Sequence, residues 1–435
     1  MSEAEFATLS SMYIAGGFLG AMTSGQLNGG RLSLMRAISL FFLLGSAIET
    51  LAGSVLVMSF GRFIAGIGAG AAGVVGPLYI KEIAPPEERG LFGTMTQVFI
   101  NLGILITQVL GYYLSRGSMW RIILSVGGGL AVIQFMGLLG SRESPIWLAN
   151  NGHPEAAKEV LERIRSKSGG LSEESTDVES AGLLANAGSP IQSHHNRGGS
   201  GSGSTCDRPM HQSTKNNAVG FYQLLRDPLY RPAITAVVGV MLIQQFTGIN
   251  SIMMYSVSLL QGVLPISSSL LTIGISILNL VVTVACAGLP DKIGRKKALL
   301  ISIAGMGLWS LILAIALRTQ AKLLAAISVL AFVASFATGL GPVAFILPPE
   351  LVHQEASDAL MRVALGSSYL GTFIVAQFFP LLNTFLNEKL GGKGWVYFIF
   401  AATGALSFVF VGWKVPETKG KKDADEVWKK VTRAD

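Results

Sequence analysis

The chain contains eleven apolar stretches, each about 20 residues long, with polar segments between them. A helix of about 20 apolar residues is long enough to cross the hydrocarbon core of a bilayer. Half of the 435 residues are hydrophobic and only 14% are charged. Soluble domains carry about 25% charged residues, so this composition excludes an ordinary soluble fold. The pattern predicts an all-α, polytopic transmembrane bundle that is surrounded by the lipid bilayer.

Five predicted spans precede a long polar segment and six follow it. The spans cover residues 9–27, 36–56, 60–80, 91–112, 122–140, 233–258, 266–289, 298–317, 323–347, 363–385 and 394–413. The predicted domains are an N-terminal half-bundle at 1–140, a cytoplasmic loop at 141–232 with short helices and a disordered stretch at 167–218, a C-terminal half-bundle at 233–413 and a cytoplasmic tail at 414–435.

The formal net charge is +7, and the basic residues gather in loops on alternate sides of successive spans. Arg31, Arg89, Lys292 and Lys419 lie in such loops. Cytoplasmic loops of membrane proteins carry an excess of Lys and Arg. We therefore expect these loops and the C-terminus to be cytoplasmic, and we do not expect a nucleic acid partner.

The polar residues of the chain do not form a pattern that is typical of an enzyme. Cys206 lies in a polar loop and Cys286 in an apolar run, so neither a disulfide framework nor a metal-binding cysteine pair is indicated. No nucleophile and base, metal-ligand cluster or phosphate loop stands out. The sequence therefore predicts no catalytic residue, no metal site and no cofactor.

Residues 61–90 read GRFIAGIGAGAAGVVGPLYIKEIAPPEERG and carry the strongest local signal. Gly66 and Gly70 lie four residues apart, which gives a helix a smooth stripe for a close neighbour. A second signal is the tight turn DKIGRKK at 291–297. A third is PETKG at 416–420, with a weaker relative, SRESP, at 141–145. Similar segments after the two half-bundles indicate an internal repeat.

Carboxamides lie inside the sixth predicted span, where residues 244–250 read QQFTGIN. A buried carboxamide without a partner costs several kcal/mol in hydrocarbon, so such a group faces a cavity or a neighbouring helix. The apolar spans and these amides together favour a carrier of a neutral polar solute.

The motifs taken together resemble the sugar porter family of the major facilitator superfamily. The resemblance rests on the strings at 61–90, 244–250, 291–296 and 416–420, and on GLGP at 339–342. It implies two six-helix halves, a central solute site and alternating access. The first predicted span resembles the family's second helix. The family's first helix is therefore missing from this sequence, through either a late start of the gene model or a truncation.

The resemblance also implies which side chains bind the solute. These are five amides: Gln97, Gln244, Gln245, Asn250 and Asn279. A carboxamide both donates and accepts hydrogen bonds without carrying charge, which suits the hydroxyls of a sugar. The alternative for each amide is a hydrogen bond between helices. Where the family often has Trp or amide side chains, this chain has Phe345, Ser368, Tyr369 and Thr372, which leaves open which sugar is bound.

The charged residues of the motifs resemble the network that gates the cytoplasmic side in the family. The predicted gating residues on that side are Glu82, Arg89, Glu143, Asp291, Arg295 and Glu350. Arg62 is a further predicted gating residue, near the start of its span and at the other end from Glu82. Glu417 is expected to join them, and Arg362 is a further possible partner of Glu350. The alternative is that these are ordinary solvated loop charges.

The amides of 244–250 predict an irregular helix. In a straight α-helix, residues five apart are rotated by about 140°, because each residue turns the chain by about 100°. Gln245 and Asn250 would then face different directions. Since the resemblance places both in one site, we expect a kink or an unwound stretch between Phe246 and Ile249, with Gly248 as the permissive residue.

No Asp, Glu or His is expected in the middle of a span, and in proton-driven members of the family that acid lies on the first helix. Uniport and proton symport therefore both stay open, with the proton as the coupling partner of the second. Residues 179–184, ESAGLL, have the form of an acidic sorting signal that an adaptor could read. A vacuolar or lysosomal membrane and the plasma membrane are the alternative locations.

The function predicted from the sequence is transmembrane transport of a hexose or a related neutral polyol by alternating access. A sugar sensor that binds without transporting, or an inactive truncated relative, is the alternative. The tail after Pro416 is short, which argues against a signalling role for it.

Overall fold

A computed structural model of the protein describes residues 3–25, 29–85, 88–115, 117–166, 219–253, 268–392, 394–421 and 424–428. The chain forms two compact units, Met1–Ser141 with Val219–Asp435, and Arg142–Ala218. The expected disordered stretch at 167–218, the sorting signal at 179–184 and Cys206 lie outside the described residues.

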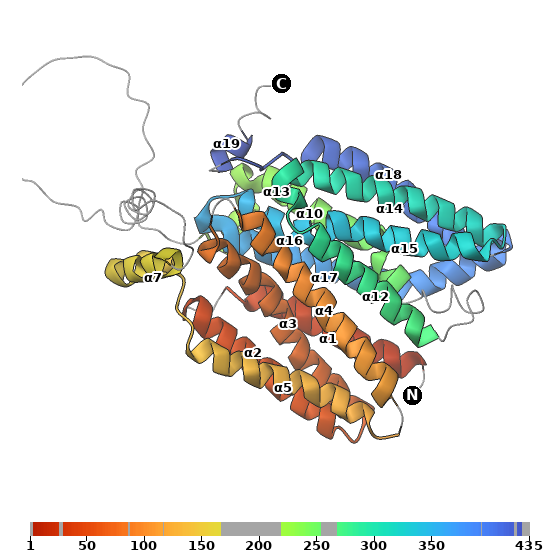
Figure 1. Ribbon diagram of the computed structural model, residues 1–435, viewed down its shortest axis with the longest axis horizontal. Coiled ribbons are helices and arrows are strands. Elements are labelled where there is room, and N and C mark those ends of the chain that lie inside the picture. Colours follow the sequence, from red (N-terminus) through yellow and green to blue (C-terminus); the bar gives the residue numbers. More distant parts are fainter. Residues whose placement is uncertain are drawn as a thin grey trace, which may run out of the picture. The chain divides into compact units, whose positions relative to one another are not determined.

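The first part of the larger unit consists of five long helices, α1 to α5 (Figure 1). They are α1 (Glu3–Thr23), α2 (Gly30–Leu51), α3 (Val55–Ile83), α4 (Arg89–Leu114) and α5 (Trp120–Leu139). Each coincides with one of the five spans predicted before the polar segment.

The second part of the larger unit is also helical. It contains α9 (Phe221–Arg226), η2 (Pro228–Tyr230), α10 (Arg231–Phe246), α12 (Ser268–Ala285), α13 (Leu289–Ile293), α14 (Arg295–Arg318), α15 (Lys322–Thr338), α16 (Leu340–Glu350), α17 (Gln354–Leu390), α18 (Trp395–Lys414) and α19 (Ala424–Trp428). Six predicted spans correspond to α10, α12, α14, α15 with α16, α17 and α18. The helix α17 begins nine residues before the predicted boundary at 363.

Nine stretches among the described residues are long and apolar enough to cross a membrane. Pro228–Met253 and Lys322–Glu350 are two of them, and each combines shorter helical pieces. The helix Ser269–Ala285 is apolar but shorter. The helix α1 is not among the nine, although it occupies the first predicted span.

Glycines allow α1 and α3 to lie against each other. A β-carbon on Gly66 would lie 2.3 Å from the Tyr13 carbonyl oxygen, and one on Gly70 would lie 1.9 Å from that of Gly17. Both distances are far below van der Waals contact, so only glycine fits at these two positions. The expectation of a smooth helical stripe at Gly66 and Gly70 is confirmed.

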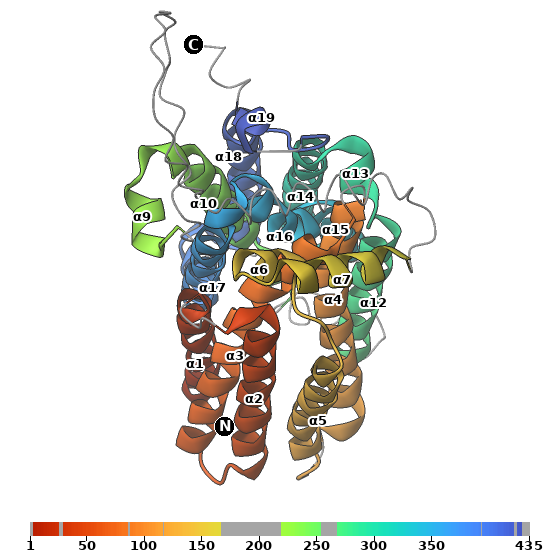
Figure 2. The same cartoon turned by 90° about the vertical axis from the view of Figure 1, so that its left-hand side faces the viewer.

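The two parts of the larger unit are packed against each other along several helices. The contacts run between α1 and α17, between α4 and α12, and from α3 and α4 to α16. Figure 2 shows the red and orange helices α1 to α3 beside the blue α17. Below, the first part is called the N half and the second part the C half.

The smaller unit contains two short helices, α6 (Pro145–Asn150) and α7 (Pro154–Ser166). The Ser144 hydroxyl caps α6 by accepting a hydrogen bond from the Trp147 N–H. The helix α7 is strongly amphipathic and coincides with the short helix predicted within 150–166.

Candidate functional site

The helix α10 is interrupted inside the motif QQFTGIN. Regular α-helix ends at Phe246, and a turn at Thr247 and Gly248 precedes a further helical stretch at 249–253. Gly248 has φ +93°, a left-handed conformation that side chains other than glycine rarely adopt. A β-carbon there would also lie 2.5 Å from the Phe400 ring. The expected break between Phe246 and Ile249 is therefore confirmed.

The break brings four polar side chains of the C half together, and we call them the Gln245 group: Gln244, Gln245, Asn250 and Ser368. Asn250 Nδ2 donates to Gln245 Oε1 at 2.5 Å. Gln245 Nε2 donates to Ser368 Oγ at 3.0 Å and to Gln244 Oε1 at 3.2 Å. Gln244 and Gln245 are each 5% exposed, so this is a buried chain of amides.

A second helix break holds Gln244 in place. The predicted span at 323–347 is divided into α15 and α16 at Gly339, whose β-carbon would lie 2.2 Å from the Ala298 carbonyl oxygen. The Ser302 hydroxyl accepts a hydrogen bond from the Leu340 N–H at 3.0 Å. Gln244 Nε2 then donates to the Leu340 carbonyl oxygen at 3.2 Å.

The other two predicted amides belong to a separate cluster, the Asn101 group: Gln97, Asn101, Asn279 and Thr283. Asn101 Oδ1 accepts from Gln97 Nε2 at 3.0 Å and from Asn279 Nδ2 at 3.2 Å. Asn101 Nδ2 donates to Thr283 Oγ1 at 2.8 Å. Because α4 belongs to the N half and α12 to the C half, the cluster joins the two halves within the apolar spans.

Sequence reasoning missed Asn101 and Thr283. Asn101 follows Gln97 by four residues, which places the two on one face of α4. Thr283 has the same spacing from Asn279 on α12. That repeated spacing was the signal that could have identified both residues. Met254 and Tyr255, which follow the QQFTGIN motif, lie outside the described residues.

Among the described residues, Asn279 Oδ1 is buried without a hydrogen-bond partner. Buried polar atoms are normally paired, so an orphaned acceptor inside a membrane span requires an explanation. A hydroxyl donor from a bound solute would satisfy it. In the described part of the chain, no group of three or more His, Cys, Asp or Glu could hold a metal ion.

Arg295 lies at the centre of the first cluster of charges, in the C half. Its Nε and Nη2 atoms donate to the Glu350 carboxylate at 3.1 and 2.9 Å, a bidentate pair. Its Nη1 atom pairs with Asp291 at 3.0 Å, and its backbone N–H donates to Glu417 Oε1 at 2.8 Å. Four of the predicted charges, including Glu417, are therefore brought together. Glu350 pairs with Arg295, and no contact between Glu350 and Arg362 was found among the described residues.

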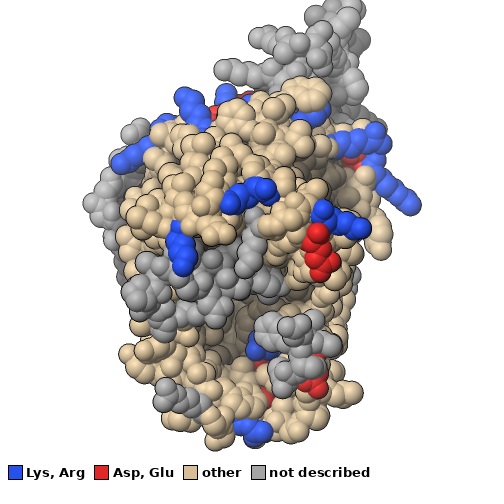
Figure 3. All heavy atoms as spheres, turned by 90° about the vertical axis from the view of Figure 1, so that its right-hand side faces the viewer, with Lys and Arg blue, Asp and Glu red and all other residues tan. Residues whose placement is uncertain are grey.

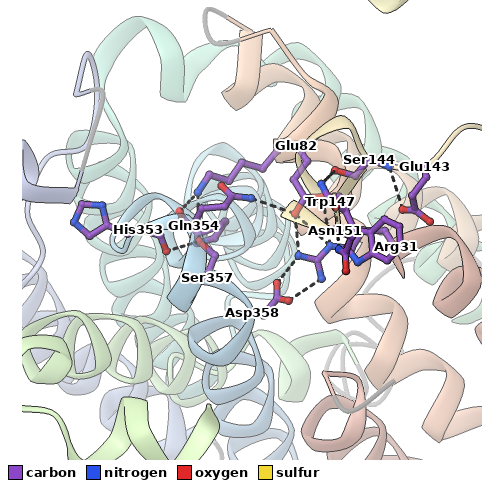
Figure 4. A network of polar contacts seen from close by, with 12 residues as sticks. Arg31, Glu82, Glu143, Ser144, Trp147, Asn151, His353, Gln354, Ser357 and Asp358 are labelled. Carbon is purple, nitrogen blue, oxygen red and sulfur yellow. Dashed lines mark hydrogen bonds and ion pairs between the residues drawn. The ribbon is translucent and has the colours of Figure 1, made fainter. Parts of the chain in front are cut away.

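A second cluster of charges connects the two halves. Arg31 Nη2 lies 2.8 Å from Glu82 Oε1 in its own half and 2.7 Å from Asp358 Oδ1 in the C half. Gln354 Nε2 of the C half also donates to Glu82 at 3.2 Å. Figure 4 shows Arg31 between the two carboxylates. Sequence reasoning identified Glu82 but missed its partner Arg31, and it also missed Asp358, which pairs with Arg31 from the C half.

The Lys81 ammonium also reaches across, to the Pro349 carbonyl oxygen and to Ser357 Oγ. The β-carbon of a residue replacing Gly90 would lie 2.1 Å from Asp291 Oδ1, so the α4 backbone touches the first cluster. The bundle is therefore closed at this end, where α3 ends and α4 begins. We call it the Glu82 end.

The remaining predicted gating residues are Arg62, Arg89 and Glu143, and the Arg89 guanidinium interacts electrostatically with Glu350 of the first cluster. Arg62 lies near the start of α3, at the opposite end from Glu82, and pairs with Glu49. Arg62 therefore lies apart from the charges at the Glu82 end, as its place near the start of the predicted span indicated. In the described chain, Arg89 Nε is buried without a hydrogen-bond partner. Glu143 belongs to the smaller unit, where it accepts a hydrogen bond from the Ser144 N–H at 3.0 Å.

Glu49 is a buried acid that the sequence analysis did not single out. It is only 4% exposed and lies in the last turn of α2. Its Oε2 atom is 3.4 Å from Arg62 Nε. A buried acid is therefore present within a membrane-spanning helix, two residues before its last residue, Leu51.

Comparisons with known proteins agree with this architecture. The family model described as "Sugar (and other) transporter" matches residues 2–425. A probable metabolite transport protein of Saccharomyces cerevisiae is 33% identical, and the alignment covers 98% of this chain and 83% of that protein. The glucose transporter GlcP of Staphylococcus epidermidis is 28% identical, with coverage of 97% and 87%.

Solved structures show the same fold. The proton:xylose symporter XylE, bound to 6-bromo-6-deoxy-D-glucose, is similar with a TM-score of 0.80 at 24% identity. The similarity covers 99% of this chain and 91% of that chain. The apolar spans and the family match identify an integral membrane protein. The chain belongs to the sugar porter family of the major facilitator superfamily.

Proposed function

We propose that the protein carries a hexose or a related neutral polyol across its membrane by alternating access. The observation that carries the proposal is the break of α10, because it gathers uncharged amides in a buried position. A sugar hydroxyl both donates and accepts, and a carboxamide matches both functions. The relative named as a glucose transporter supports a sugar as the solute.

The solute site is proposed to include Gln97, Gln244, Gln245, Asn250 and Asn279. Two further side chains extend it: Asn101, which orients Gln97 and Asn279, and Ser368, which bonds to Gln245. Exchanging these hydrogen bonds for bonds to a sugar keeps every buried polar group paired. Binding then does not require a charged group to leave water.

Alternating access needs a closure that can be released. The Arg31 and Arg295 clusters, with Lys81, are proposed to be that closure at the Glu82 end. Breaking the Arg31–Asp358 pair would allow the halves to separate there. The bias of basic loops makes this end cytoplasmic, together with the C-terminus. A vacuolar or lysosomal membrane and the plasma membrane both fit the proposal.

The test is exchange of radiolabelled D-glucose, D-xylose and myo-inositol in proteoliposomes. We expect saturable exchange of at least one solute, and Gln245→Leu should abolish it because the variant removes both hydrogen-bonding functions at similar volume. Gln134→Leu is the matched control, since Gln134 is an exposed amide on α5. Unchanged exchange in Gln245→Leu would remove Gln245 from the site. Solute binding without exchange would favour the sensor instead.

A further inference from the structure

The Glu49–Arg62 pair is a buried charged site that the proposed solute pathway does not use. Glu49 projects from α2 onto α3, where Gly61 leaves room for it. A β-carbon on Gly61 would lie 2.8 Å from Glu49 Cγ, so only glycine allows this close approach. The Glu49 side chain is 5% exposed, whereas that of Arg62 is 35% exposed.

The contact between the two charges is loose. The shortest distance is 3.4 Å, between Arg62 Nε and Glu49 Oε2. Arg31 shows the contrast, because it holds carboxylates at 2.8 and 2.7 Å. Within the described residues, no hydrogen bond to the Glu49 carboxylate was found. A buried carboxylate with a single distant partner is poorly compensated for the water that it has lost.

The other ionisable groups around Glu49 are few. Tyr13 on α1 is close enough to both charges to interact with them electrostatically. Arg121 at the start of α5 donates to the Ala52 carbonyl oxygen at 3.0 Å, just beyond the end of α2. In the described part of the chain, Arg62 is the one group that forms an ion pair with Glu49. Protonation would therefore leave a neutral acid that needs no counter-ion.

Two ion pairs join the same two helices at opposite ends. Glu49 on α2 pairs with Arg62 on α3, whereas Arg31 on α2 pairs with Glu82 on α3. The Arg31 pair extends to Asp358 of the C half. A change of charge at Glu49 therefore acts on the two helices that carry the closure at the Glu82 end.

Figure 3 views the unit from the right-hand side of Figure 1. The surface is hollowed near the centre, and atoms of basic and acidic residues show inside the hollow. Ionisable groups inside membrane spans commonly belong to ion or proton pathways.

We propose that Glu49 is a proton-binding site that is coupled to transport, with Arg62 as its counter-ion. The inference rests on the proposed function. In the binding step, a hydronium ion transfers its proton to a Glu49 carboxylate oxygen and becomes water. Arg62 stays charged and turns toward solvent. After the solute leaves on the other side, Glu49 returns the proton to water and forms its ion pair with Arg62 again.

The experiment uses proteoliposomes that contain the full chain and a trapped pH-sensitive dye, with D-glucose, D-xylose and myo-inositol as probes. The wild type should acidify the lumen when an exchanged probe is added outside. The ratio measured is acidification per molecule of probe that enters probe-free vesicles in net uptake. In Glu49→Gln this ratio should fall at least fivefold, because the amide cannot bind a proton at neutral pH. Glu388→Gln, at an exposed acid on α17, should keep the wild-type ratio.

A second variant tests the same site if Glu49→Gln does not fold. Arg62→Gln removes the counter-ion, so Glu49 holds its proton to higher pH. The midpoint of the acidification signal should then move upward by about one pH unit or more. An unchanged midpoint in a folded Arg62→Gln protein would overturn the assignment.

The outcomes separate the two proposals. Net uptake of a probe without any acidification in the wild type would overturn the proton site and leave the carrier function standing. Wild-type acidification that persists unchanged in Glu49→Gln would assign the proton to another group. If the wild type exchanges none of the three probes and binds none of them, the proposed function fails, and the proton site fails with it.

Discussion

Asn250 Nδ2 donates to Gln245 Oε1 at 2.5 Å, although the two residues lie five positions apart and would diverge on a regular helix. The turn at Thr247 and Gly248 makes the bond possible, because it interrupts the regular helical rotation that would point the two side chains in different directions. The proposed solute site is thus assembled by an irregular backbone. Irregular backbone is tolerated at membrane depth where it lines a cavity or is buried in protein.

We expect Gly248→Ala to reduce sugar exchange at least tenfold. The left-handed conformation costs an L-residue roughly 1–2 kcal/mol, and the new methyl group would lie 2.5 Å from the Phe400 ring. The measurement is exchange in proteoliposomes with equal amounts of protein. Gly274→Ala on α12 is the control, because its β-carbon meets nothing within 4 Å. Partial recovery of exchange in the double variant Gly248→Ala with Phe400→Leu would identify the ring contact as part of the cost. Equal exchange in Gly248→Ala and Gly274→Ala would contradict the prediction.

Asn101→Val should raise the KM for the transported sugar more than it lowers the maximal rate. The variant removes the hydrogen bonds that Asn101 makes with Gln97, Asn279 and Thr283. An unpaired buried polar group costs about 1–3 kcal/mol, which corresponds to a loss of affinity of roughly tenfold. Thr107→Val, at an exposed position on the same helix, should leave KM unchanged. A purely structural role of Asn101 would lower the rate and the yield while KM stays constant.

Asp358→Asn should shift the carrier toward the state that is open at the Glu82 end. The substitution removes the charge that links Arg31 to the C half, a part-exposed pair worth about 1 kcal/mol. Thiol labelling of Ser368→Cys from that side, in a background without Cys206 and Cys286, should become several-fold faster. The charge exchange Arg31→Asp with Asp358→Arg should not restore closure fully, because Glu82 would then face a second acid. Equal labelling rates with and without Asp358→Asn would show that the Arg31–Asp358 pair does not hold the halves together.

Arg295→Ala should open the same end through the C half. The variant leaves Glu350 and Asp291 without their shared cation, and the two carboxylates then repel each other. We expect faster labelling of Ser368→Cys and a lower thermal stability. Lys296→Ala is the control, since Lys296 lies beside Arg295 and its ammonium donates only to the Gly412 carbonyl oxygen among the described residues. Equal labelling rates in Arg295→Ala and Lys296→Ala would mean that Arg295 contributes only to the membrane topology.

The fold was predictable because apolar length and helix packing are local properties. All five helices of α1 to α5 follow from runs of apolar residues, and the Gly66 and Gly70 spacing indicated their closest contact. The break at Gly248 followed from helical rotation. The Arg31–Asp358 pair could not be predicted, since 327 positions separate the two residues and only the packed halves bring them together. Arg62 was singled out in the sequence and Glu49 was not, because their pairing depends on how α2 crosses α3.

The shared position of Arg31 determines how much the closed state resists opening. If the halves part at the Glu82 end, Arg31 loses Asp358 but keeps Glu82, whose side chain is 2% exposed. The stranded group is Asp358, which is already 28% exposed and is therefore easily hydrated. In the proposed cycle, the deeply buried Arg31–Glu82 pair therefore stays intact while the halves separate. Arg31 would then add little to the cost of opening, and a carrier that must reverse its orientation at every turnover would gain speed from that.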